Sequence, residues 1–432
     1  MTDRERASLS AAAVTRRLLG ELFGHDGRAN IAVRLWDGTH WPDDRPRAAT
    51  LVLRHPGALR AMFADGTELS LSEAYLYDDF DIEGDIESVF GLADAIAERT
   101  GGWRNKLRAF AELRRLPLAP ERGTGRRGRA SLRGRKHSVE RDRQAVRYHY
   151  DVSNDFYRLW LDSRMVYSCA YFKSPDTDLD TAQLAKLDMI CRKLRLRSGQ
   201  RLLDIGCGWG GLVMHAAREY GVDATGITLS QPQADLANRL AAEAGLAGRC
   251  RVEVRDYRAV DSSRPFDVLV SVGMFEHVGE RMLPAYFGKA ASLLAPGGVF
   301  LNHGIASRAT DPAGHGPSFS NTYVFPDGET LPINVTLHAA ENAGFEVRDV
   351  ESLREHYAMT LRHWVRRLEA HHEEALRHAD EPTYRVWRLF MSGSADGFRD
   401  GRYNVYQTLL GVPGKDGASG LPLTRSDWYK PP

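Results

Sequence analysis

Cysteine is scarce in this chain, and the few cysteines form no recognisable pattern. The 432 residues include four, Cys169, Cys191, Cys207 and Cys250, which lie far apart with no CxxC pair and no histidine pair at ligand spacing. Disulfide scaffolds and zinc sites need cysteines in paired or closer spacing. We therefore predict neither kind of site, and we expect a reducing, cytoplasmic location.

Long apolar runs are also missing. No segment approaches the roughly 18 to 20 apolar residues that a membrane-spanning helix needs. The N-terminal stretch lacks the apolar core of a signal peptide, because Arg16 and Arg17 interrupt it. If the protein acts on lipid, we expect it to work from the surface, as a peripherally membrane-associated protein.

Net charge is nearly absent as well. Lysine and arginine number 58 and aspartate and glutamate 57, which gives a formal charge of +1 at pH 7. A protein whose whole surface binds nucleic acid carries a strong basic excess. The composition therefore argues against a nucleic-acid partner, and any charge-driven contact must be local.

The length indicates more than one domain, since 432 residues exceed what one hydrophobic core usually holds. Residues 28–95 alternate strand-like pieces with turn residues, and we predict a small N-terminal α+β domain over residues 1–118. In residues 103–116, apolar side chains recur at helical spacing and arginine or lysine fills the other faces. This pattern predicts a basic amphipathic helix, for contact with a membrane or with a second copy in a homodimer.

A strongly basic segment follows this domain. Residues 121–143 contain eight arginines and one lysine against two glutamates and one aspartate, with glycine interspersed. We interpret residues 119–143 as a flexible linker. It serves either as a solvated tether or as a patch for an anionic membrane surface, where each basic residue contributes about 1 kcal/mol. A nucleic-acid role is the weaker alternative, because no aromatic residues are interleaved.

Strand and helix patterns alternate from residue 200 onward. Such alternation predicts an α/β domain, here residues 144–432, with a mostly parallel sheet and helices on both faces. We expect seven strands, with residues 403–412 as an antiparallel edge strand. Ligands of such sheets bind beyond the carboxyl ends of the strands.

The first strand-to-helix turn, "LLDIGCGWGG", is rich in glycine. Gly206, Gly208 and Gly210 allow a sharp turn and the close approach of a ligand, and Asp204 can order the loop. A lone glycine pattern is weak evidence for a cofactor site. A dinucleotide is the rival ligand, but the acidic residue that it needs on the second strand is replaced by "GITLSQPQ".

Eight motifs in order carry a family resemblance. They are "YHYDVSNDFYRLWLDSRMVYSCAYF", "LDIGCGWGGL", "GITLSQPQ", "RDYR", "VSVGMFEHVG", "NHGI", "YVFPDGETLP" and "HYAMTLRHW". Over roughly residues 148–398 the chain resembles the cyclopropane-fatty-acyl-phospholipid synthase family. The resemblance implies a class I methyltransferase (Rossmann-like) fold, S-adenosyl-L-methionine as cofactor, and the unsaturated acyl chains of phospholipids as substrate.

The family's cofactor contacts fall on matching residues of this chain. The resemblance places them at Tyr167, Ser168, Asp204, Gly206, Gly208, Trp209, Gly210, Thr228, Leu229, Ser230, Gln233, Asp256 and Tyr257. Without the resemblance, Tyr167 and Tyr257 are equally compatible with core aromatics.

The family's base is a bound bicarbonate, and its ligands also have counterparts here. The resemblance places them at the side chains of Glu276, His303 and Tyr357 and at the backbone of Cys169 and Ile305. Without it, Glu276 and His303 would be interpreted as a structural pair. Metal binding by these two residues and His277 fits no dedicated spacing, and His277 is expected to point elsewhere.

The resemblance also implies a reaction course. Methyl transfer to an alkene leaves a carbocation, aromatic faces stabilise it, and loss of a proton closes a cyclopropane ring. Candidate lining residues are Tyr171, Phe172, Phe275 and Tyr323. Ser394 stands where some members carry a cysteine, so covalent cysteine catalysis is not expected. A methylene or methyl-branched product, a small-molecule or nucleic-acid methyltransferase and an inactive lipid-binding module remain alternatives.

Overall fold

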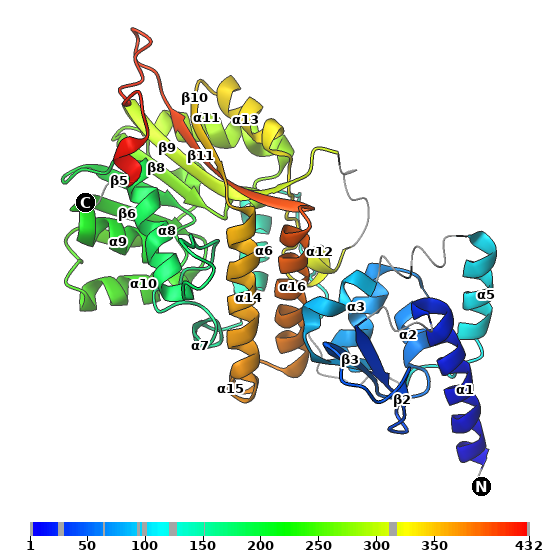
Figure 1. Cartoon of the computed structure of the whole chain (residues 1–432). Helices are drawn as coiled ribbons and strands as arrows, with labels where there is room; N and C mark the ends of the chain where they lie inside the picture. Colours follow the sequence, from blue (N-terminus) through cyan, green and yellow to red (C-terminus); the bar gives the residue numbers. More distant parts are fainter. Residues whose placement is uncertain are drawn as a thin grey trace. The chain divides into compact units, whose positions relative to one another are not determined.

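The computed structural model describes most of the chain, and the described part forms two compact units (Figure 1). The described residues are 3–24, 30–63, 65–92, 96, 102–120, 128–150, 152–310 and 318–429. The first unit comprises residues 1–129, 315–324 and 380–396, and the second comprises residues 130–314, 325–379 and 397–432. None of the helices in the described ranges has the length and apolar character needed to cross a bilayer.

The first unit is built around a small mixed sheet of strand order β2-β1-β3-β4. Strand β1 pairs with β3 in parallel, and the other pairings are antiparallel. Its elements are α1 (Asp3–Phe23), β1 (Ile31–Arg34), β2 (His40–Trp41), β3 (Ala49–Leu53), α2 (Ala58–Phe63), α3 (Glu68–Leu76), β4 (Phe80–Gly84), α5 (Trp103–Leu113) and α12 (Phe319–Tyr323). The predicted α+β class of this region is confirmed.

Buried arginines explain why a late helix belongs to this first unit. Within α16 (Glu381–Arg399), Arg385 donates to the backbone oxygen of Tyr75 at 2.8 Å. Arg388 donates to the Tyr75 hydroxyl at 2.9 Å and to the Ile82 oxygen at 3.1 Å. These bonds join α16 to α3 and β4 of the first unit. The division therefore differs from the predicted one, which assigned residues 380–396 to the C-terminal domain.

The predicted linker is partly ordered. Residues 121–127 lie outside the described residues, but α6 (Val139–Tyr150) begins within the 119–143 segment. Arg141 forms an ion pair with Asp327 in the second unit, and Arg129 pairs with Glu73 in the first. In its described part, the basic segment is therefore held by specific partners and is not a uniform flexible tether.

The second unit contains a seven-stranded sheet of order β10-β11-β9-β8-β5-β6-β7. Its strands are β5 (Arg201–Ile205), β6 (Asp223–Thr228), β7 (Cys250–Val254), β8 (Phe266–Val272), β9 (Leu294–Ser307), β10 (Glu346–Ser352) and β11 (Tyr403–Gly411). The five strands from β7 to β9 are parallel, and β11 runs antiparallel to both of its neighbours. The predicted sheet is confirmed. The predicted edge position of β11 is wrong, because β10 lies outside it.

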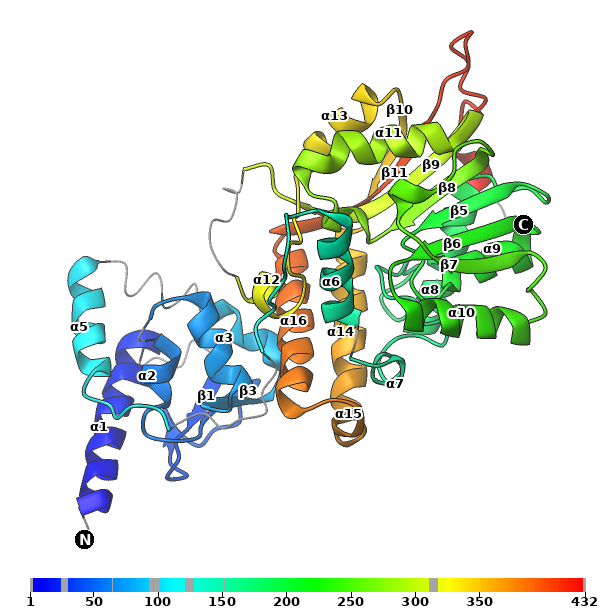
Figure 2. The same ribbon diagram turned by 180° about the vertical axis from the view of Figure 1, so that it is seen from behind.

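Helices cover both faces of this sheet (Figures 1 and 2). On one face lie α8 (Leu179–Lys193), α9 (Gly211–Tyr220) and α10 (Gln231–Glu243), and on the other lie α11 (Leu283–Leu293) and α13 (Ile333–Asn342). The remaining helices of the unit are α7 (Asn154–Arg158), α14 (Arg354–Ala370) and α15 (His372–His378). Layers on both faces bury the sheet, as parallel strands require.

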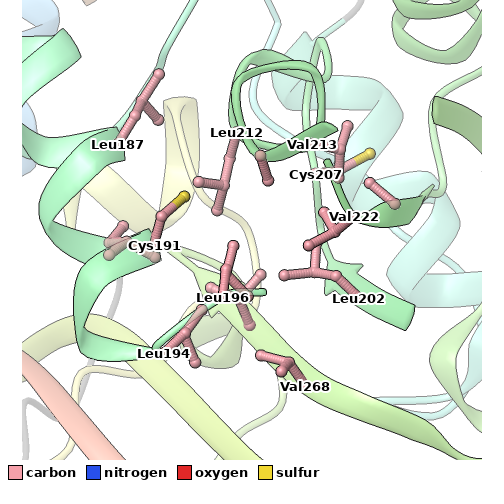
Figure 3. Close-up of a cluster of buried hydrophobic side chains, with 14 of the residues drawn as sticks. Leu187, Cys191, Leu194, Leu196, Leu202, Cys207, Leu212, Val213, Val222 and Val268 are labelled. Atoms are coloured by element: carbon pink, nitrogen blue, oxygen red, sulfur yellow. The ribbon is translucent and has the colours of Figure 1, made fainter. Parts of the chain in front are cut away.

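The core between α8, α9 and the sheet fixes the base of the glycine loop. Figure 3 shows Cys191 of α8, and Leu194 directly after this helix, facing Leu202 and Val268 of the sheet. Cys207 packs into the same cluster, as predicted for a small packing residue. Each fully buried aliphatic side chain of this kind contributes about 1.5 to 3 kcal/mol. The glycine loop is therefore anchored in this hydrophobic cluster through Cys207.

Candidate functional site

A hollow opens at the carboxyl ends of β5 and β6, where such sheets bind ligands. Together with the open solvent space at its mouth, it has a volume of about 800 Å³. The wall consists of residues from the glycine loop, the ends of β6, β7 and β8, and one face of α6. It is formed by His137, Asp142, Val146, Tyr150, Ile205, Gly206, Gly208, Ile227, Thr228, Leu229, Gln233, Arg255, Asp256, Tyr257, Arg258, Gly273, Met274, His277, Val278 and Met282.

The glycine loop needs glycine for two separate reasons. Gly206 has a φ of +86°, and a Cβ there would lie 2.7 Å from Cγ of Met274. Gly210 has a φ of +80° and caps α9, and a Cβ there would lie 3.0 Å from Cβ of Ala237. Positive φ is unfavourable for residues with a Cβ. The sequence thus brings the backbone, free of side chains, to the edge of the hollow.

Seven of the predicted cofactor residues line this hollow. They are Gly206, Gly208, Thr228, Leu229, Gln233, Asp256 and Tyr257. The other six, which are not part of its wall, are Tyr167, Ser168, Asp204, Trp209, Gly210 and Ser230. Two of these six support the wall: Ser230 caps α10 by accepting from the Gln233 N–H, and Trp209 donates to Asn154 at 2.7 Å.

Polar groups on the wall are paired with one another. The Thr228 hydroxyl donates to Oε1 of Gln233 at 2.7 Å. Arg258 donates to both Asp256 oxygens, at 2.8 and 2.6 Å, and to Asp142 at 2.8 Å. These bonds hold the Asp256 carboxylate in place and connect α6, through Asp142, to the end of β7.

Sequence reasoning missed the contribution of α6. His137 and Asp142 line the hollow although both fall in the predicted linker. A signal was present, since Ser138 precedes Glu140 and Asp142 in the pattern of a helix N-terminus. His277, which was expected to point away from the predicted base site, lines the hollow, and burial lowers the pKa of its imidazole to about 4.

None of the five residues predicted to hold the base lines the hollow, but Glu276 precedes the wall residue His277, and His303 bonds the wall residue Gly273. We call Glu276, His303, Tyr357 and the backbone of Cys169 and Ile305 the polar cluster. Glu276 follows β8 in a short 3-10 turn, Phe275–His277. The Phe275 ring packs against Gly304, where a Cβ would lie 1.8 Å from a ring carbon. The "NHGI" glycine therefore lets this turn lie flat against β9.

That packing places Glu276 on the backbone of β9. Its Oε1 accepts from the Ile305 N–H at 2.7 Å, and its Oε2 is buried with no hydrogen-bond partner among the described residues. Burial raises the pKa of this carboxyl to about 7. The predicted backbone ligand at Ile305 is thus bonded to Glu276 itself.

His303 lies on β9 in register with the end of β8. Its backbone oxygen accepts from the Gly273 N–H at 2.8 Å, and Gly273 lines the hollow. The side chain is 2% exposed, and its Nε2 is buried with no partner in the described part of the chain. Burial, reinforced by Lys186 and Lys193, holds the imidazole pKa well below its usual value, so the ring is neutral.

Tyr357 and Cys169 adjoin one another. The Leu353 oxygen accepts from the Tyr357 N–H at 3.1 Å and lies 3.7 Å from the Cys169 sulfur. Burial raises the pKa of both side chains, and the charge of Glu276 adds to the rise at Tyr357. Glu276 and Tyr357 are therefore close enough to interact electrostatically, and Cys169 is an unreactive thiol.

Ser168 and Asp204 belong to a buried network that the sequence did not reveal. Lys186 of α8 is 1% exposed and donates to the Ser168 hydroxyl at 2.8 Å. Asp204 Oδ1 has no hydrogen-bond partner among the described residues. Burial lowers the pKa of Lys186 to about 8 and raises that of Asp204 to about 7.

The four aromatic residues predicted to line the site lie elsewhere in the structure. Tyr171 stacks on His356 at 4.9 Å, Phe172 stacks on His363 at 5.6 Å, and Phe275 is a core residue. Tyr323 belongs to the first unit. None of the four lines the hollow.

A row of other rings runs from the hollow to the polar cluster. Tyr150 on the wall lies 6.2 Å from Tyr167, Tyr167 lies 5.2 Å from Trp364, and Trp364 lies 6.1 Å from Tyr357, as measured between ring centroids.

Within the described residues, no group of three or more His, Cys, Asp or Glu side chains is arranged for a metal ion.

The chain matches the family model described as mycolic acid cyclopropane synthetase over residues 137–408. It is 40% identical to a probable fatty acid methyltransferase from Pseudomonas putida, over 93% of this chain and 96% of that protein. The chain belongs to the mycolic acid cyclopropane synthetase family. It is an S-adenosylmethionine-dependent methyltransferase of the cyclopropane synthase type, and both the predicted resemblance and the predicted class I methyltransferase fold are confirmed.

Solved members of the family match about three fifths of the chain. The mycolic acid cyclopropane synthase CmaA1 complexed with SAH and CTAB is 36% identical, with a TM-score of 0.59, over 62% of this chain and 97% of that one. A probable fatty acid methyltransferase from Mycobacterium tuberculosis aligns over 95% of this chain at 36% identity. The N-terminal region is therefore shared with the relatives named fatty acid methyltransferases.

The residues present suit the family's cofactor. The hollow combines open backbone at Gly206 and Gly208 with apolar side chains such as Leu229 and with the fixed carboxylate of Asp256. Apolar walls suit a purine ring, and carboxylates and backbone groups suit amino and hydroxyl groups. The lining of this hollow therefore fits S-adenosylmethionine, and we call the hollow the cofactor pocket.

Proposed function

We propose that this protein transfers the methyl group of S-adenosylmethionine to the double bond of unsaturated acyl chains of membrane phospholipids, giving a cyclopropane fatty acid. The observation that carries the proposal is the polar cluster. A carboxylate atom of Glu276 and an imidazole atom of His303 lie buried without partners beside the cofactor pocket. Unpaired buried polar atoms are costly and need a functional explanation.

The surroundings of the cluster support an alkene as the methyl acceptor. Bound S-adenosylmethionine supplies an electrophilic methyl group. An alkene is a poor nucleophile, so the chain must hold it in a dry slot and stabilise the cation that forms. The rings of Tyr150, Tyr167, Trp364 and Tyr357 offer π faces between the pocket and the cluster.

Ring closure also needs a base. Cys169 has a pKa raised by burial and lies too deep to serve. We propose that bicarbonate fills this role, held by Glu276, His303, Tyr357 and the backbone of Cys169 and Ile305. The unpaired atoms Glu276 Oε2 and His303 Nε2 support this assignment, since a small oxyanion carrying one proton donates to the first and accepts from the second.

An exposed surface in the first unit supports membrane contact. Leu107 and Phe110 on α5 are 58% and 43% exposed, and Leu118 just beyond the helix is 74% exposed. Arg114 lies over the Phe110 ring at 5.6 Å. Apolar side chains beside arginines suit an anionic lipid surface. We propose that this face brings the enzyme to its phospholipid substrate.

The test is transfer of labelled methyl groups to vesicles. The protein and methyl-labelled S-adenosylmethionine are incubated with vesicles of monounsaturated phosphatidylglycerol, with saturated vesicles as the matched control, and with RNA. Label in the unsaturated acyl chains alone supports the proposal. Label in RNA or in small solutes, or no label at all, contradicts it. Proton spectra of the product distinguish a cyclopropane from a methylene or methyl-branched chain.

The membrane face has its own test. Leu107→Ser combined with Phe110→Ser is expected to reduce co-sedimentation with phosphatidylglycerol vesicles about tenfold, because each removes exposed apolar area and keeps the charge. Leu423→Ser is the control, since Leu423 is fully exposed in the second unit. Equal sedimentation of the double variant and the wild type would contradict the assignment.

A further inference from the structure

Gln407 is a buried amide that belongs to none of the family motifs seen in the sequence. It lies on β11 directly opposite His303 on β9, in an antiparallel pair. The residue is 1% exposed, and its Nε2 lies 3.2 Å from Nδ1 of His303. Gln407 is therefore the side chain that the sheet places against the imidazole.

Both polar groups have one further atom buried without a partner. Within the described residues, Oε1 of Gln407 and Nε2 of His303 form no hydrogen bond. The bond at Nδ1 decides which ring nitrogen carries the proton. When the amide nitrogen donates, Nδ1 must accept, and the ring proton resides on Nε2.

We infer that Gln407 is a positioning residue that orients the His303 ring and keeps its proton on Nε2. The ring then presents a hydrogen-bond donor on the side away from β11. This inference rests on the proposed function in one respect, which is that the donor serves a small oxyanion held with Glu276. A reversed amide would leave a lone pair on Nε2, and two acceptors would then face the same anion.

The wild-type protein gives the direct test. In protein labelled with ¹⁵N at the ring nitrogens of its 15 histidines, the His303 signals are assigned by their loss in His303→Phe. We expect a protonated Nε2 and an unprotonated Nδ1 from pH 6 to 8. A protonated Nδ1, or a mixture of the two tautomers, would overturn the inference, and this result needs no variant of Gln407.

Variants add a functional measurement. Gln407→Met keeps the length and removes the amide, and we expect a mixture of tautomers together with a bicarbonate concentration for half-maximal rate raised about tenfold, the size of one lost hydrogen bond. The KM for S-adenosylmethionine should stay unchanged. Thr408→Val is the matched control, because Thr408 is equally buried on β11 but faces the other side of the sheet.

The outcomes separate this inference from the proposed function. If the wild-type rate does not depend on bicarbonate, the proposed base is wrong, and the tautomer of His303 still decides the role of Gln407. If Gln407→Met retains the wild-type tautomer and bicarbonate dependence, Gln407 has no positioning role, whatever the base.

Discussion

The cofactor pocket and the polar cluster are adjacent, yet they differ in how their polar groups are satisfied. In the pocket, Thr228 bonds Gln233 and Arg258 bonds Asp256. In the cluster, Glu276 and His303 each keep an atom buried without a partner among the described residues. Leaving such an atom unpaired costs about 1 to 3 kcal/mol. These polar side chains of the pocket are therefore hydrogen-bonded, whereas the cluster keeps unpaired polar atoms that lower the stability of the fold.

This difference predicts different results for mutations in the two regions. Changes in the pocket should alter cofactor affinity, because its groups form a preorganised wall. Changes in the cluster should alter turnover and leave cofactor binding nearly intact if, as we propose, its groups hold the base of the reaction.

The largest effect is expected at the cluster. Glu276→Gln keeps the bond from the Ile305 N–H and removes the negative charge at Oε2, so turnover should fall at least about a hundredfold. The dissociation constant for S-adenosylmethionine, measured by calorimetry, should change less than about threefold. Glu280→Gln, an exposed carboxylate four residues away, is the control. Unchanged turnover in Glu276→Gln would remove the base assignment.

A smaller effect is expected in the pocket, at the glycine loop. Gly206→Ala places a Cβ 2.7 Å from Met274 at a φ of +86°, and we expect cofactor affinity to fall about tenfold to a hundredfold. Gly199 has the same φ of +86° but open space around it. Gly199→Ala should therefore lose stability without losing affinity. Equal affinity loss in both variants would show that strain, not the shape of the loop, explains the result.

The same contrast explains what could be predicted from the sequence. The pocket residues occur within short motifs such as "DIGCGWGG" and "TLSQPQ", and the family resemblance that these motifs carry placed them. Seven of the 13 predicted residues line the hollow. Gln407 and Lys186 could not be identified in this way, because only long-range pairing of β11 with β9, and of α8 with the "YSC" segment, brings them to the site.

Two errors in the fold have a similar cause. Strand β10 reads "EVRDVES", in which charged residues outnumber apolar ones and the apolar residues do not alternate. It was therefore not identified as a strand, and the edge position was assigned to β11. The start of α6 was hidden by the surrounding arginines, which suggested a tether although Asp142 and Arg258 bond across the pocket. Charge composition alone does not show whether a basic segment has partners.

A variant of the buried Lys186 tests whether the affinity of the pocket for S-adenosylmethionine depends on the positive charge of this side chain. Lys186→Met removes the donor to Ser168 and the positive charge nearest Asp204, and we expect the dissociation constant for S-adenosylmethionine to rise about tenfold. Lys193→Met is the matched control, since Lys193 is equally buried on the same helix but pairs with Glu351. Both variants should lose stability. If both also lost affinity equally, the effect would come from α8 as a whole.

The smallest effect concerns stability and follows from the cost assigned to the cluster. Burial raises the Glu276 pKa from 4.5 to about 7, so between these values the folded chain binds more protons than the unfolded chain. Stability therefore falls as pH rises through this window. The free energy of unfolding of the wild type relative to Glu276→Gln should decrease by about 1 kcal/mol from pH 6 to pH 7, as measured by denaturant titration. A difference that is independent of pH would mean that Glu276 is as well solvated as the groups of the pocket wall, and the contrast between the two regions would not hold.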